Sequence, residues 1–351
     1  MINRKRTKKI KVGDVYVGGD APISIQSMCN TDTRDVDATV SQIRELTQAG
    51  CEIIRVAIPD MEAAKAIGEI KRQINIPLVA DIHFSADFAM EVIRQGIDKL
   101  RINPGNIGNE EKVAMLVREC QKKSIPIRIG VNAGSLEKDI LEKYEGVVTA
   151  EGMVDSAMRH IEILEKYNFK DIAVSLKASD IERTVEAYRL LSEKVDYPLH
   201  IGVTEAGTSF RGTIVSSVGL GILLYEGIGD TMRVSLTANP VEEIAVAEEI
   251  LKSLGLRKTG ISVTSCPTCG RTEINIISLA NKVEEAVKVI DKDIKVAVMG
   301  CVVNGPGEAK EADLAIVGGK DVGLIMKKGE LVKKVDEKDL LEEFLKEIEK
   351  F

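Results

Sequence analysis

The sequence lacks the features that mark secreted, membrane-spanning and nucleic-acid-binding proteins. Six cysteines scattered over 351 residues are too few for a disulfide framework. No run of about 18 apolar residues occurs, and no apolar segment follows the basic N-terminus, so neither a membrane span nor a signal peptide is predicted. The net charge of −7 argues against a general nucleic-acid binder. We therefore expect a cytoplasmic protein with no membrane or nucleic-acid partner, in which any basic site is local.

Short apolar, β-branched runs alternate with helical patterns up to Gly255. Near-continuous apolar runs are typical of parallel strands that are buried on both faces. Eight such runs lie at residues 22–28, 52–58, 77–84, 98–104, 125–132, 171–179, 198–207 and 230–237. Between them, apolar residues recur at helical spacing, as at Val40, Ile43 and Leu46. Eight strands alternating with helices favour a (β/α)8 TIM barrel over a doubly wound sheet.

Two further segments flank this pattern. Residues 9–19 alternate apolar and polar side chains around Gly13 and predict a small hairpin. After residue 255 the pattern changes to a mixed set of strands and helices, and "GLRKTG" at 255–260 is a plausible linker. We therefore divide the chain into a barrel domain at 1–255 and a small α+β domain at 260–351.

Polar side chains gather at the C-terminal ends of the predicted strands, where the chemistry of a barrel takes place. Many fall in pairs spaced by two residues, which puts both side chains on one face of a strand. Taken singly, each also fits an edge residue or a core ion pair. Together they include five cations, and guanidinium groups suit bidentate recognition of phosphate, so we expect a multiply charged anion as the ligand. The set is Arg55, Asp81, His83, Arg101, Asn103, Arg128, Asn132, Lys177, Arg233 and Ser235.

A carboxylate and a histidine in this region are candidates for proton chemistry. Glu205, in the Gly-rich segment "EAGTSFRG", is available as a proton donor or acceptor beside the cations. Asp81 is placed to orient His83 or the hydroxyl groups of a ligand. Of the three histidines, only His83 ends a predicted strand. A solvated or packed role is favoured for His160 in its helix, and a core role for His200 in mid-strand.

Three of the six cysteines lie in the second domain. Cys266 and Cys269 form a C-x-x-C pair after one predicted strand, and Cys301 ends the next. Such a pair alone favours zinc or redox chemistry, but structural zinc needs four ligands and this domain has no fourth cysteine and no histidine. The nearest remaining donor is Glu308, after a Gly-Pro-Gly bend. Three thiolates and one displaceable carboxylate suit a [4Fe-4S] cluster with one iron open to a substrate oxygen.

Seven segments carry a resemblance to one known family. They are "VADIHF", "LRINPGN", "IRIGVNAGSLE", "VSLKAS", "GVTEAGT", "SCPTCGRT" and "VMGCVVNGPGE". Together they resemble the 4-hydroxy-3-methylbut-2-enyl diphosphate synthases of the methylerythritol phosphate isoprenoid pathway, in their two-domain bacterial form. The resemblance implies a TIM barrel followed by an iron-sulfur domain. It also implies reductive ring opening and dehydration of 2-C-methyl-D-erythritol 2,4-cyclodiphosphate, with two electrons delivered through a [4Fe-4S] cluster.

The resemblance also implies roles for individual residues. The three cysteines of the second domain and Glu308 match the cluster ligands of the family, and Glu205 matches its acid/base glutamate. The ten polar residues at the strand ends match positions that bind the cyclic diphosphate. The family further implies a homodimer, in which the cluster domain of one chain caps the barrel mouth of the other. Ferredoxin or flavodoxin is implied as the electron donor.

Two other interpretations stay open on the residues alone. One is a pterin- or sugar-phosphate-binding barrel related to dihydropteroate synthase, with a zinc-stabilised second domain and no redox step. The other makes the second domain a zinc-bound interaction module without catalysis. Colour distinguishes them from the iron-sulfur enzyme, because a [4Fe-4S] protein is brown and a zinc protein is colourless.

Overall fold

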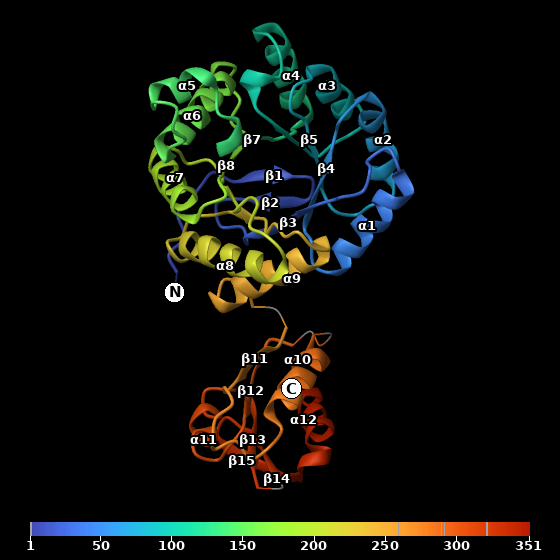
Figure 1. Ribbon diagram of the computed structural model, residues 1–351. Helices are drawn as coiled ribbons and strands as arrows, with labels where there is room; N and C mark the ends of the chain where they lie inside the picture. Colours follow the sequence, from blue (N-terminus) through green and yellow to red (C-terminus); the bar gives the residue numbers. More distant parts are fainter. Residues whose placement is uncertain (1, 259, 289, 291, 321) are drawn as a thin grey trace. The chain divides into compact units, whose positions relative to one another are not determined.

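The chain divides into two compact units, residues 1–256 and 257–351, each with its own hydrophobic core (Figure 1). The computed structural model describes residues 2–258, 260–288, 290, 292–320 and 322–351. Thr259, within the predicted linker, therefore lies outside the described residues. No helix in the described part of the chain is long and apolar enough to cross a membrane.

The first unit is the predicted (β/α)8 barrel. Its parallel strands neighbour one another in the order β8-β7-β6-β5-β4-β3-β10-β9, and a parallel bridge between Val174 and Leu199 joins the two ends of this series. The strands are β3 (Ser24–Met28), β4 (Ile53–Ala57), β5 (Leu78–Asp81), β6 (Lys99–Ile102), β7 (Ile127–Asn132), β8 (Ile172–Lys177), β9 (His200–Ile201) and β10 (Thr231–Met232). The fold class predicted for this part of the chain is confirmed.

The last two barrel strands are much shorter than the sequence predicts. The runs at 198–207 and 230–237 yield only the two-residue strands β9 and β10. Some backbone hydrogen bonds continue past them, as from Arg233 N to Ile201 O at 3.0 Å. The chain then leaves the extended conformation, because Glu205 adopts a left-handed φ of 54°. The rest of each run forms loops at the mouth of the barrel, and the left-handed residue accounts for this in the seventh run.

Helices surround the barrel, and shorter turns follow two of its strands. Apart from α8, each long helix begins with an Asp, Ser, Asn or Thr side chain that accepts a hydrogen bond from a backbone N–H of the first turn. The long helices are α1 (Val36–Gln48), α2 (Met61–Arg72), α3 (Ala86–Arg94), α4 (Glu110–Lys123), α6 (Ala150–Lys166), α7 (Ile181–Lys194), α8 (Ser209–Tyr225) and α9 (Pro240–Ser253). The short turns are η1 (Pro104–Asn106), η2 (Ala133–Ser135) and α5 (Lys138–Lys143).

The predicted N-terminal hairpin is present and covers the end of the barrel opposite the mouth. It consists of β1 (Ile10–Val12) and β2 (Val15–Val17). Its buried side chains form one apolar cluster with residues near the N-terminal ends of three barrel strands, namely Ile53, Val79 and Ala173. Because this cluster fills the bottom of the barrel, the polar interior opens toward the C-terminal ends of the strands.

The second unit is a five-stranded mixed sheet with helices. Strands β11 (Ser262–Ser265), β12 (Lys295–Met299) and β13 (Leu314–Gly319) run parallel, and β14 (Val322–Lys327) and β15 (Glu330–Asp336) continue the sheet antiparallel. The helices are α10 (Ile276–Val287), α11 (Gly305–Glu308), η3 (Glu337–Asp339) and α12 (Leu340–Glu349). The small α+β domain predicted for this part of the chain is confirmed. The apolar pattern at 274–290 predicts a longer helix than α10, and Val289 within it lies outside the described residues.

Candidate active site

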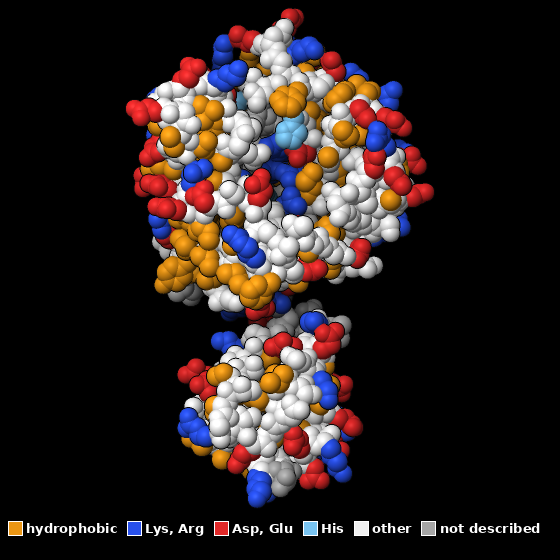
Figure 2. Space-filling model, in the orientation of Figure 1, with side chains coloured by type: hydrophobic (Ala, Val, Ile, Leu, Met, Phe, Trp, Pro, Cys, Tyr) orange, Lys and Arg blue, Asp and Glu red, His pale blue; other side chains and the backbone are white. Residues whose placement is uncertain are grey.

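Charged side chains occupy the inward positions of the barrel strands, where branched apolar residues usually lie. Their sequence neighbours Ile54, Leu100 and Ile129 face outward into the apolar core beneath the helices. Figure 2 shows Lys and Arg side chains lining the hollow in the middle of the barrel. The strand period of two therefore gives these strands an apolar outer face and an inner face that is polar toward the mouth and apolar at the bottom, where Ile53, Val79 and Ala173 lie.

Asp81, at the end of β5, is the acidic centre of this interior. Its Oδ1 lies 3.1 Å from Arg101 Nη1, and its Oδ2 lies 3.7 Å from Arg55 Nε. Burial alone would raise the pKa of Asp81, but the nearby Arg55 and Arg101 charges outweigh burial and lower it. His83 Nε2 lies 3.7 Å from the same Oδ1, and its side chain is 55% exposed at the rim. Asp81 is therefore ionised and holds two guanidinium groups and one imidazole together.

Gly130 on β7 makes room for Arg101. Arg101 Nη2 donates a hydrogen bond to Gly130 O at 2.6 Å. A Cβ atom at position 130 would come within 2.2 Å of Arg101 Nε, so any larger residue would displace the guanidinium group. The N–H of Gly130 donates to Asn103 Oδ1 at 3.0 Å, and this fixes the side chain just beyond β6. One glycine therefore positions two of the predicted site residues.

Two cations lie deeper in the barrel. Arg128 is 1% exposed and donates to Ser175 Oγ at 2.9 Å. Lys99 is fully buried, and neither Lys99 Nζ nor Arg128 Nε has a hydrogen-bond partner within the described part of the chain. Burial, followed by the Arg128 charge, lowers the pKa of Lys99 to about 7. The interior therefore carries positive charge that the protein leaves largely unpaired.

Lys177 and Arg233 occupy the other side of the mouth. Arg233 pairs with the buried carboxylate of Glu243 on α9 at 3.3 Å. No hydrogen bond or ion pair is found for Lys177 among the residues that the structure describes. Burial and then the Arg55 and Arg128 charges lower its pKa well below the ordinary value. A Cβ atom at Gly202 would lie 2.9 Å from Lys177 Nζ, so a second glycine makes room for a cation.

The interior therefore has an excess of positive charge. The buried or half-buried cations are Arg55, Lys99, Arg101, Arg128, Lys177 and Arg233. The carboxylates that pair with them are Asp81 and Glu243. Buried charges are costly unless they are paired, so this arrangement favours a ligand with several negative charges.

A hollow of about 440 Å³ at the mouth brings together three more of the predicted residues. Its lining includes Asn132, Lys177 and Glu205. Glu205 is exposed, and its left-handed backbone costs on the order of 1 kcal/mol, which the surrounding loop must hold in place. Ser235 is half-buried beyond β10. The mouth thus places a carboxylate beside the cationic interior.

The sequence prediction missed Lys99 and Glu243. Lys99 lies two residues before Arg101 and shares its face of β6, so the same parity argument would have found it. Glu243 lies in the helical pattern "VEEIAVAEEI", which is typical of a solvated helix. Its pairing with Arg233 depends on how α9 packs against β3 and is not visible in the sequence.

The six cysteines fall into two classes. Cys29, Cys51 and Cys120 are buried in the barrel, where burial raises the pKa of each thiol to about 12. The three cysteines of the second unit are half-buried or exposed. The barrel thiols are therefore structural, and Cys120 lies on the buried face of α4 with Leu116 and Val117.

The thiols of the second unit follow neighbouring strands. Cys266 comes directly after β11, and Cys301 follows its parallel neighbour β12, so both lie at one end of the sheet. Cys266 Sγ accepts a hydrogen bond from Gly300 N at 3.2 Å. Cys269 is exposed, and a hydrogen bond from the Arg271 backbone lowers the pKa of its thiol.

Glu308, the fourth predicted ligand, ends the short helix α11, which contacts β12 and β13. Its side chain is exposed. Across the described residues, no group of three or more His, Cys, Asp or Glu side chains is close enough together to hold a metal ion. The structure therefore places the predicted ligands on neighbouring elements without assembling them into a metal site.

Comparison with known proteins identifies relatives along almost the whole chain. The model of the GcpE TIM-barrel domain matches residues 7–248, and that of the GcpE protein C-terminal domain matches residues 262–350. A 4-hydroxy-3-methylbut-2-en-1-yl diphosphate synthase (flavodoxin) from Clostridium perfringens is 60% identical over 348 residues, which are 99% of each chain. The enzyme of the same name from Ruminiclostridium cellulolyticum is 59% identical and covers 99% of this chain and 98% of its own.

Solved structures resemble the chain at much lower identity. Dihydropteroate synthase from Stenotrophomonas maltophilia aligns with a TM-score of 0.52 at 11% identity, over 71% of this chain and 97% of that one. N-acetylneuraminic acid synthetase from Leptospira borgpetersenii aligns with a TM-score of 0.51 at 13% identity, over 82% and 99%. These similarities show a shared fold alone.

The unpaired charge of Lys99 predicts a pH-dependent stability. Its pKa of about 7 in the folded protein lies below the ordinary value of 10.5, so between these values the unfolded chain binds the extra proton. Below about pH 7 the buried ammonium group of Lys99 destabilises the folded protein by its full amount. This destabilisation decreases as the pH rises from about 7 toward 10.5. We expect Lys99→Met to stabilise the barrel by roughly 1–4 kcal/mol near pH 6, and by less near pH 9.5. Calorimetric unfolding of the variant and the wild type at both pH values tests this, with Lys122→Met at an exposed position as the control. The prediction would be contradicted if the difference in the free energy of unfolding between Lys99→Met and the wild type were the same at both pH values.

Proposed function

The chain belongs to the GcpE family, and we infer that it catalyses the reaction of 4-hydroxy-3-methylbut-2-en-1-yl diphosphate synthase in the methylerythritol phosphate pathway. This enzyme opens the ring of 2-C-methyl-D-erythritol 2,4-cyclodiphosphate, adds two electrons and removes water to give 4-hydroxy-3-methylbut-2-enyl diphosphate. The observation that carries the assignment to this site is the excess of buried positive charge in the barrel. A cyclic diphosphate supplies the negative charge that this interior lacks.

Different residues around the mouth are assigned to different parts of this substrate. We assign the diphosphate to Arg55, Arg101, Arg128, Lys177 and Arg233, whose charges are only partly neutralised by the protein. The polar side chains that remain would contact the hydroxyl groups and the ring oxygens; they are Asp81, His83, Asn103, Asn132 and Ser235. Glycines make room for Arg101 and Lys177, and the contacts of Arg101 with Gly130 O and Asp81 hold its guanidinium group in position before the substrate arrives.

We propose that the second unit holds a [4Fe-4S] cluster through Cys266, Cys269, Cys301 and Glu308. Three thiols, none of them fully buried, and one exposed carboxylate form a donor set that suits iron with one exchangeable position. Such a cluster supplies single electrons and a Lewis-acidic iron. With a cluster bound, the Gly300 N–H would donate a hydrogen bond to the Cys266 sulfur, and such bonds spread the negative charge of cluster sulfurs.

Glu205 is the proposed proton donor and acceptor. Its carboxylate lines the same hollow as Lys177 and Asn132, so it reaches a substrate bound over the cations. Glu205 has a left-handed backbone and belongs to a loop, not to a barrel strand. This placement supports a role in proton transfer, and the cations would bind the phosphate groups.

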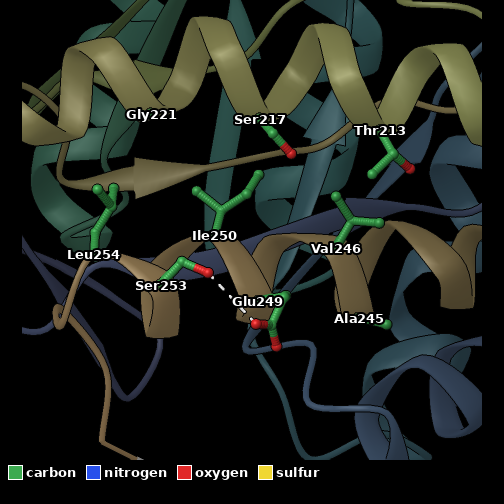
Figure 3. A pocket seen from close by; sticks show the side chains of 9 residues that line it. All are labelled: Thr213, Ser217, Gly221, Ala245, Val246, Glu249, Ile250, Ser253 and Leu254. Atoms are coloured by element: carbon green, nitrogen blue, oxygen red, sulfur yellow. Dashed lines mark hydrogen bonds between the residues drawn. The ribbon is translucent and has the colours of Figure 1, made fainter. Parts of the chain in front are cut away.

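We further propose a homodimer in which the cluster unit of one chain caps the barrel mouth of the other. An exposed apolar stripe on α8 supports contact with a second copy; it comprises Phe210, Ile214, Val218 and Tyr225. Figure 2 shows hydrophobic side chains gathered over this helix. Beside it, a groove of about 410 Å³ lies between α8 and α9, with small side chains such as Thr213, Ser217 and Ala245 along its walls (Figure 3). Large exposed apolar patches of this kind mark interaction sites.

The electron donor is proposed to be flavodoxin, which the names of the two relatives from Clostridium perfringens and Ruminiclostridium cellulolyticum specify. A cytoplasmic location is proposed with it, because flavodoxin and the cyclic diphosphate are both soluble reactants of the cell interior.

The first test of this function is spectroscopic and catalytic. Protein purified without oxygen should absorb broadly at about 410 nm, contain about four irons per chain, and convert the cyclic diphosphate when reduced flavodoxin is supplied. Cys301→Ser should lose most of the absorption and the turnover. Cys120→Ser, which changes a buried barrel thiol, should keep both. A colourless protein with stoichiometric zinc under strict exclusion of oxygen would contradict the assignment.

The role of Glu205 predicts a change in rate without a change in the cluster. Glu205→Gln should lower kcat by about 100-fold or more, since general acid–base groups contribute factors of about 10²–10⁴. Absorption and iron content should match the wild type, because the residue lies outside the second unit. The exposed Glu111→Gln on α4 serves as the control. Wild-type turnover in Glu205→Gln would exclude this role.

The stripe on α8 predicts where the dimer can be broken. Val218→Lys adds a charge to the apolar stripe and should shift the protein from dimer to monomer in sedimentation experiments at micromolar concentration. Met115→Lys, at an exposed apolar position on α4, should leave the dimer intact. A Val218→Lys protein that sediments like the wild type would show that α8 is not the contact.

A further inference from the structure

One buried histidine links two loops at the mouth of the barrel. His160 on α6 is 1% exposed. Its Nδ1 accepts a hydrogen bond from Gly105 N at 3.1 Å, and its Nε2 lies 2.9 Å from Glu137 Oε1. Gly105 belongs to η1, close after Asn103, and Glu137 belongs to the loop that follows Asn132. A single imidazole ring therefore contacts both segments that carry the asparagines of the mouth.

These contacts fix the position and the tautomer of the ring. A Cβ atom at Gly105 would lie 2.9 Å from His160 Cε1, so the loop approaches the ring as closely as a glycine allows. Because Nδ1 accepts a hydrogen bond, the proton of the neutral ring is on Nε2 and faces Glu137. Burial would raise the pKa of Glu137, but the imidazole of His160 at 2.9 Å, with smaller contributions from the backbone and Ser156, lowers it to about 2. Both ring nitrogens are thus engaged, and the carboxylate is ionised.

We propose that His160 is a positioning residue for the cyclic diphosphate. It fixes η1 and the segment 132–137 in the arrangement in which Asn103 and Asn132 face the ligand, without touching the ligand itself. Asn103 Oδ1 already accepts from Gly130 N, so its amide N–H groups remain as donors. This inference deepens the proposed function and rests on it.

A histidine that only filled space in the core would behave differently. Its replacement by an apolar residue of similar size would leave ligand binding unchanged, whatever it did to stability. A positioning residue, in contrast, changes the affinity for the ligand when either of its contacts is lost. A binding measurement therefore distinguishes the two roles. The contact between His160 and Gly105 can be tested by changing either residue.

The experiment is a calorimetric titration of the anaerobically purified holoenzyme with 2-C-methyl-D-erythritol 2,4-cyclodiphosphate, without reductant so that no turnover occurs. We expect His160→Leu to raise the Kd by about tenfold or more, because both polar contacts are lost. His160→Asn, whose amide oxygen can replace Nδ1 as the acceptor for Gly105 N, should recover part of the affinity. Gly105→Ala, which forces the loop away from the ring, should also raise the Kd.

The control is Leu164→Ala, a truncation of a fully buried core side chain one turn further along the same helix. It should lower the unfolding temperature but keep the wild-type Kd. Wild-type affinity in His160→Leu would overturn the inference, and so would an equal loss of affinity in His160→Leu and Leu164→Ala. If the wild-type holoenzyme itself does not bind the cyclic diphosphate, the proposed function fails instead, so the two failures are distinguishable.

Discussion

The burial of positive charge inside the barrel is the constraint on which the rest of this structure depends. Moving a guanidinium or ammonium group out of water is costly, and ion pairs with two carboxylates offset only part of that cost for the cations of the interior. Other features follow from this constraint. Glycines at 130 and 202 make room for the cationic side chains, and Asp81 lies within 3.7 Å of two of them. The charge that stays unpaired favours an anion as the ligand of the mouth.

The chain divides its chemistry between its two units. The barrel supplies charge and hydrogen-bond donors, whereas the accessible thiols belong to the second unit. The barrel alone would not identify the enzyme, because dihydropteroate synthase and N-acetylneuraminic acid synthetase share its fold at 11% and 13% identity. The match of both units to GcpE models, with 60% identity to a relative over the full length, sets this chain apart from them.

Much of the candidate site could be predicted from the sequence, because side chains two residues apart on a strand point to the same face. Once Arg101 is placed on an inward face, Asn103 and Lys99 share that face, and the same argument places Arg128 with Asn132. The failures have physical causes. The seventh and eighth runs are apolar enough for long strands, but the left-handed backbone at Glu205 turns the seventh into a loop. Glu243 lies in a helical pattern, and its partner Arg233 belongs to a different part of the barrel, directly after β10.

The sequence by itself determined the eight-fold alternation, the inward positions of the charged residues and the spacing of the thiols. These features depend on local periodicity, which each segment carries within itself. Only the tertiary structure decided which side chains meet. Glu243 reaches Arg233 because α9 packs against β3, and His160 reaches Gly105 and Glu137 because α6 packs beside two mouth loops. Such contacts join segments that are distant along the chain, so their geometry arises from packing and not from any local pattern.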